Sequence, residues 1–150
     1  MTIRLSTGCR NAMLGDTTHK GIKGALDSGF MNVYTGTQPA SADTGATGTL
    51  LGTVTVNNDG VTGITWTAAA SGVLAKNGSE LWQFGGLAAG VAGWFRFYPA
   101  GGSPGSTSTT EVRVDGLIGT AGADANMSNT NVALSAVSTV DSASITMPAS

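Results

Sequence analysis

The chain has 150 residues, a length that suits one domain with a true hydrophobic core. Charged residues make up 11% of it, whereas ordinary soluble domains have about 25%. The formal net charge of −2 excludes the basic footprint of a nucleic-acid-binding protein. Weak repulsion between copies favours a component of an assembly over a freely diffusing enzyme.

Cys9 is the only cysteine, which excludes an internal disulfide and a thiolate metal cluster. The N-terminus lacks the basic and then apolar layout of a signal peptide, and no apolar run approaches the roughly 18–20 residues that span a bilayer. We therefore expect synthesis in a reducing cytoplasm and no membrane partner.

Residues 1–29 are expected to form an arm and a broken helix. After the arm, Ser6 or Thr7 can cap a first helical turn, and the polar run 16–20 interrupts the helix. A second helical pattern then continues until Gly29, which can act as its C-cap. Basic residues outnumber acidic ones in this part of the chain, so it could dock on an acidic partner. The alternative is that these charges form a solvated helix face.

Residues 30–150 read as the β domain. The first strand is expected at 30–35, followed by a long irregular link over 36–48 and an alternating strand over 49–56. The turn residues 57–60 predict that 61–67 returns as a hairpin partner. Asn77-Gly78 predicts a second hairpin, between 73–76 and 79–82.

An aromatic strand at 93–98 carries bulky side chains on both faces and is expected to be covered on both sides. After the loop 100–108, residues 110–115 place valines on one face, and Glu111, Arg113 and Asp115 on the other. This alternation predicts a strand with one wet face, paired antiparallel with the aromatic strand.

Two late strands are expected around 132–136 and 143–147, the last at a sheet edge. The total is about eight to ten short strands with turn signals every 8–12 residues. That pattern indicates an all-β sandwich, jelly roll or barrel.

No catalytic residue can be nominated. Ser103 lies in a G-x-S-x-G pattern, but Pro104 cannot donate the N–H that an oxyanion hole needs, so we expect a hairpin loop. Cys9 and His19 are ten residues apart, about 15 Å along a helix. A core cysteine and a surface histidine are the better interpretation.

No metal or cofactor site is expected either. Residues 124–129 resemble the start of a calcium loop but lack its glycine and its final glutamate, so side chains that cap their own turn explain them better. The aromatic residues Trp66, Trp82, Trp94 and Tyr98 could form a sugar-stacking platform, although a domain this size needs most of them in its core.

Several stretches are similar to a known family. These are residues 33–43 (VYTGTQPASAD), 48–51 (GTLL), 3–7 (IRLST), 93–96 (GWFR), Asp115-Gly116 with Gly119-Thr120, and 124–130. Together they resemble small virion structural proteins of tailed bacteriophages over nearly the whole chain. The resemblance implies a jelly-roll-like β-sandwich of antiparallel strands with an N-terminal helical arm. It also implies the capsid cement or decoration type, bound as an oligomer to the outside of the capsid.

We therefore expect a non-enzymatic protein of the capsid exterior that binds the major capsid protein and itself, as a homodimer or homotrimer. The expected contact residues lie in the arm and the link, because long exposed irregular segments are usually binding elements. They are Ile3, Arg4, Leu5, Arg10, Gln38, Pro39 and Asp43. The alternative is a tail, neck or fibre module that binds host glycan or another tail protein. A cell-wall hydrolase fits worst, because no nucleophile and base can be assembled.

Overall fold

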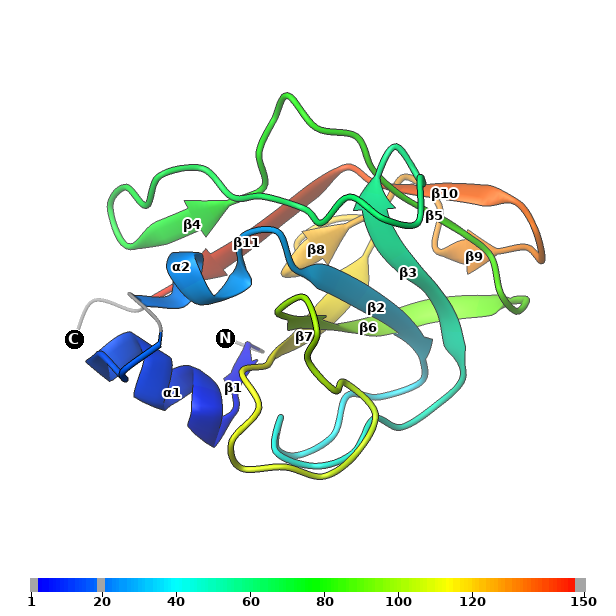
Figure 1. Ribbon diagram of the computed structural model, residues 1–150. Helices are drawn as coiled ribbons and strands as arrows, with labels where there is room; N and C mark the ends of the chain where they lie inside the picture. The colour runs from blue at the N-terminus through cyan, green and yellow to red at the C-terminus, as the bar shows by residue number, and fades with distance from the viewer. Residues whose placement is uncertain (1–2, 19–20, 148–150) are drawn as a thin grey trace.

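The computed structural model describes residues 3–18 and 21–147 (Figure 1). The chain is mostly β, with two short helices near its N-terminus. The elements are, in chain order, β1 (Arg4–Leu5), α1 (Thr7–Leu14), α2 (Gly21–Leu26), β2 (Phe30–Thr35), β3 (Leu50–Val56), β4 (Val73–Ala75), β5 (Trp82–Gly85), β6 (Gly90–Tyr98), β7 (Val114–Gly119), β8 (Ala125–Asn126), β9 (Asn131–Val132), β10 (Val137–Val140) and β11 (Ser142–Thr146).

The strands form one curled sheet in the order β10-β5-β3-β2-β6-β7-β8-β11-β4, while β1 pairs with β7 and β9 with β6. The mostly β class is confirmed. The expectation of purely antiparallel strands is wrong, because β8 runs parallel to β7 with Ile118 beside Ala125. The Asp124 carboxylate bonds across this short return, accepting the main-chain N–H of Leu117 at 2.9 Å.

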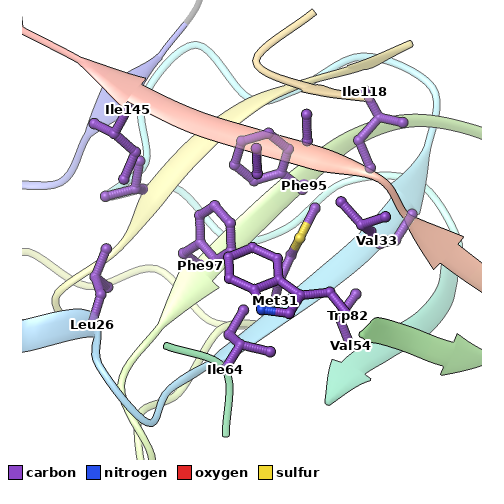
Figure 2. Packing of buried hydrophobic residues seen from close by; sticks show 14 of the residues in the cluster. Leu26, Met31, Val33, Val54, Ile64, Trp82, Phe95, Phe97, Ile118 and Ile145 are labelled. Carbon is purple, nitrogen blue, oxygen red and sulfur yellow. The ribbon is translucent and has the colours of Figure 1, made fainter. Parts of the chain in front are cut away.

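The core is packed against the central strand β6 (Figure 2). Trp66 meets Phe97 edge to face, with ring centroids 4.7 Å apart, and meets Trp82 at 5.1 Å. Trp66, Trp82 and Trp94 are all buried. The core interpretation of the tryptophans is thus confirmed, and these rings offer no exposed sugar platform.

The broken N-terminal helix is confirmed. The Ser6 hydroxyl accepts the Cys9 N–H at 3.0 Å as the N-cap of α1, and Gly15 ends that helix in the left-handed conformation at φ 91°. After α2, however, the left-handed residue is Ser28 at φ 60° rather than Gly29. Gly29 is required for space, because a Cβ there would lie 2.4 Å from the Tyr98 carbonyl oxygen.

The two predicted hairpins do not form. Residues 61–67 form no strand. They make isolated bridges, Gly29 with Ile64 and Trp66 with Lys76, and β5 takes the edge of β3 that a hairpin partner would occupy. Asn77-Gly78 does turn the chain, with Glu80 N–H donating to Asn77 at 3.2 Å. The strands it separates diverge, since β4 pairs with β11 while β5 pairs with β3 and β10.

The aromatic strand does pair antiparallel with the segment that follows, Phe97 opposite Val114 and Arg96 opposite Asp115. That partner, β7, begins at Val114 rather than at residue 110. The predicted wet face is wrong, because Arg113 and Asp115 are completely buried. The loops 36–48 and 99–113 cover them, through hydrogen bonds described below.

The C-terminal strands also differ from expectation. The alternation over 132–136 is broken at Ser135, which has φ 61°, and a strand that the sequence did not predict, β10, follows the turn. The last strand, β11, lies between β8 and β4, so it is not at the edge; β10 and β4 end the sheet instead.

Candidate docking face

The N-terminal arm is fastened to the sheet by main-chain pairing and by one buried serine. Leu5 lies opposite Val114 and Arg4 opposite Asp115, so β1 extends the sheet beside β7. The Ser6 hydroxyl donates to the Glu111 carbonyl at 2.8 Å and accepts the Arg113 N–H at 2.9 Å, in addition to capping α1. The direction of α1 is therefore fixed by the start of β7.

The link 36–48 is held to the arm by side chains from both segments. The Arg4 guanidinium donates to the carbonyls of Pro39 and Gln38. The Asp43 carboxylate accepts the Thr7 N–H and the Thr7 hydroxyl, both at 2.7 Å. Burial would raise the pKa of Asp43, but these two hydrogen bonds and the charges of Arg10 and Arg113 hold it below its usual value.

The link and the loop 99–113 are held together by two buried arginines. Arg96 binds the Asp115 carboxylate with two parallel hydrogen bonds of 2.7 Å, and its Nη1 donates to Thr44 at 3.0 Å and to Pro104 at 2.8 Å. Arg113 donates to the Ser103 carbonyl and, at 3.5 Å, to that of Ala42. We call Arg4, Arg96 and Arg113 the arginine cluster.

The electrostatics of the cluster are those of charges held out of water. Burial lowers the pKa of Arg113, and the nearby positive charge of Arg96 lowers it further. Burial raises the pKa of Asp115, against the hydrogen bonds and charge of Arg96 that favour the carboxylate. Removing one partner of such a pair would leave an uncompensated buried charge, which is strongly destabilising.

One apolar groove opens on the surface that this framework holds. It has a volume of about 260 Å³ and is lined by Leu5, Arg10, Met13 and Leu14. Leu14 is 88% exposed and Met13 37% exposed, both near the C-terminal end of α1. We call these four residues and their groove the α1 groove.

The structure brings the expected contact residues together but gives them different roles. Gln38 and Pro39 are buried, and Ile3, Arg4 and Asp43 are half-buried, so that the arm and the link meet each other. Arg10 is exposed and Leu5 lines the α1 groove. Sequence reasoning missed Met13 and Leu14, although their place at the end of a short capped helix was a usable signal.

The reactive residues considered from the sequence are Cys9, His19 and Ser103, of which the structure describes Cys9 and Ser103. Cys9 is buried, which raises its thiol pKa to about 12. His19 lies outside the described residues. Within residues 3–18 and 21–147, no group of three or more His, Cys, Asp or Glu side chains could hold a metal ion. Asn126 bonds Ala123 within its own turn, as expected for a self-capping segment.

Comparison with protein-family models, with curated proteins and with solved structures gave no significant match. None of the helices in the described part of the chain is long and apolar enough to cross a membrane.

Proposed function

We propose that this protein is a non-enzymatic virion protein of the capsid cement or decoration type. It binds the outer surface of a bacteriophage capsid and stabilises contacts between major capsid subunits. The observation that carries the proposal is the α1 groove, an exposed apolar surface on a framework of three segments tied together by buried arginines.

Rigidity supports this role, because a surface that is already ordered loses little conformational entropy on binding. The arm, the link and the loop 99–113 contain little regular structure. Nevertheless, Arg4, Arg96 and Arg113 bond main-chain carbonyls in the link and in that loop. The docking face is therefore prepared before it meets its partner.

Charge indicates what the face binds. Arg10 stands exposed at the α1 groove. By contrast, Arg4 bonds main-chain carbonyls of the link and Lys23 pairs with Asp27. A partner surface with an apolar side chain flanked by a carboxylate would complement this arrangement. Many copies, each with a modest contact across a seam between capsid subunits, would raise the cost of opening the shell.

The experiment is a binding assay with capsids assembled without this protein. We expect saturable binding of hundreds of copies over the shell. Leu14→Asp should weaken binding at least tenfold, equivalent to about 1.4 kcal/mol, without a loss of stability, because the side chain is exposed. Leu81→Asp, at another exposed leucine, serves as the control and should bind like the unchanged protein.

Absence of binding to capsids would refute the proposal. Binding of tens of copies at the tail, with none on the shell, would instead support the alternative of a tail, neck or fibre module. If Leu14→Asp and Leu81→Asp lost capsid binding equally, the α1 groove would be excluded as the contact surface.

A further inference from the structure

The two edge strands of the sheet, β4 and β10, differ in how they are covered. At one end, β4 is covered by the segment before it, since Thr67 N–H donates to the Ala75 carbonyl at 2.9 Å and Ala70 bridges Val73. At the other end, β10 pairs with β5 alone among the described strands. Figure 1 shows β10 at the margin of the sheet, beside β5.

The register shows which main-chain groups of β10 face outward. Gly86 N–H donates to Ala136, and the Leu81 carbonyl accepts from Asn57 on the side of β3. Because N–H and C=O groups alternate in direction along a strand, even-numbered residues of β5 point toward β10 and odd-numbered ones toward β3. With Ser138 opposite Phe84, the outward groups of β10 belong to Val137 and Thr139.

This outward edge is accessible. A groove of about 330 Å³ runs along it, between residues 128–133 and residues 136–139. Val137, Ser138 and Thr139 all line the groove, as expected at the edge of a strand, since alternate residues would line a face. Val137 is exposed, and Ser138 and Thr139 are half-buried.

The edge carries no charge and no proline to oppose pairing. Natural edge strands are blunted by a lysine, a proline, an inward charge, a bulge or a short length. β10 is short, with four residues, and follows the irregular turn at Ser135. No charged residue or proline occurs between Asp124 and Asp141, a stretch that includes all of β10. Val137 is 56% exposed and Leu134, in the preceding turn, is 65% exposed.

We propose that β10 is a self-association surface, at which two copies of this chain pair β10 with β10 antiparallel about a two-fold axis at Ser138. Val137 then lies opposite Thr139 of the second copy, and Thr139 opposite its Val137. Both residues point their main-chain groups outward, so the pair forms four N–H···O=C bonds with no change of register.

A second copy is the occupant because the edge is complementary to itself. The axis places Asp141 opposite Ser135 of the other copy, so no like charges meet. The inference specifies the self-association within the proposed function. The contact is small and its affinity in solution is low, but on a shell it joins neighbouring copies that are already held side by side.

Cysteine crosslinking tests the axis. In the proposed dimer, Ser138 lies opposite Ser138 of the second copy at a non-hydrogen-bonded position, where opposite Cα atoms are about 4.5 Å apart. A disulfide needs a Cα–Cα distance of about 4.4–6.8 Å. Ser138→Cys should therefore give a disulfide-linked dimer on mild oxidation. Ser106→Cys, exposed in the loop 99–113, should not exceed background. Cys9 does not interfere, being buried.

A charge at the edge gives an independent test. Val137→Lys places two lysines near the axis, and should shift concentrated protein from dimer to monomer in analytical ultracentrifugation. Val61→Lys, the same change at a residue that is 77% exposed elsewhere, should leave the dimer unchanged. Because Val137 is exposed, Val137→Lys should remain folded, and its binding to capsids can be measured separately.

The inference is overturned if Ser138→Cys gives no more crosslinked dimer than Ser106→Cys, or if Val137→Lys associates like the unchanged protein. Protection of residues 137–139 from hydrogen exchange only on capsids, with no self-association at any concentration, would assign the edge to a capsid segment instead and also overturn it. Capsid binding with these results would leave the proposed function intact.

Discussion

The central strand β6 is buried on both faces, but the faces are filled in opposite ways. On one, Phe95 and Phe97 lie in the aromatic core. On the other, Trp94 stacks on Tyr34 at 4.5 Å and Arg96 binds Asp115. The aromatic face supplies free energy of burial without direction, whereas the arginine face makes directed bonds to main-chain carbonyls of two loops. The comparison indicates that non-directional burial and the positioning of the two loops are assigned to separate sides of one strand.

The largest effect is expected on the aromatic face. Phe97→Ala removes a ring that contacts Trp66, Trp82 and Phe95, and should lower the free energy of unfolding by about 3–5 kcal/mol. Urea unfolding measures it, with Leu81→Ala at an exposed leucine as the control. If the aromatic face does not position the loops 36–48 and 99–113, hydrogen exchange in these loops should become faster only by the amount that the lower global stability explains.

On the arginine face, Asp115→Asn keeps the shape of the side chain but leaves the Arg96 charge buried without its counter-ion. We expect a loss of about 3 kcal/mol, together with exchange in the loops 36–48 and 99–113 that is faster than global unfolding explains. Hydrogen exchange followed by mass spectrometry measures both. If Asp115→Asn lost as much stability but left the two loops as protected from hydrogen exchange as they are in Phe97→Ala, the division between the faces would be contradicted.

At the margin of the arginine face, Asp43→Asn weakens two hydrogen bonds to Thr7. The expected loss is about 1 kcal/mol, accompanied by faster proteolytic cleavage in the arm or the link. Limited proteolysis provides the measurement. Asp141→Asn, at an exposed aspartate after β10, is the matched control; cleavage of both variants at the same rate would show that Asp43 does not hold the arm.

The smallest effect concerns pH. Burial would raise the pKa of Glu80, but hydrogen bonds from Thr65 and Trp82 and the Lys76 charge lower it below its ordinary value of 4.5. A lowered folded-state pKa means that the unfolded chain takes up the proton first. The contribution of Glu80 to stability is therefore complete above pH 4.5, and it is lost as the pH falls through the pKa of Glu80 in the folded state. Glu80→Gln should reduce this acid dependence in urea unfolding; an unchanged dependence would contradict it.

The sequence predicted what local signals determine. Ser6 caps a helix, 30–35 and 93–98 form strands, and Asn77-Gly78 turns the chain, because each depends on neighbouring residues. The pairings of β4 and β5 were missed, since the partner of a strand depends on which sheet edge is free. The parallel return of β8 was missed for the same reason.

The buried charges were misread for a different reason. Glu111, Arg113 and Asp115 alternate with valines as they would on an exposed strand, and only the covering loops make that face an interior. The segments proposed for the candidate site lie together, because Arg4 bonds main-chain carbonyls of the link and Thr7 bonds Asp43. Which of their residues remain exposed depends on those contacts, which the sequence pattern does not contain.

Imaging by electron cryo-microscopy of capsids with and without this protein tests the central claim most directly. We predict extra density repeated over the outer surface at seams between capsid subunits, fitted by the curled sheet with the α1 groove against the shell. Density confined to the tail, a shell with no added density, or copies bound with the α1 groove toward solvent would contradict the account.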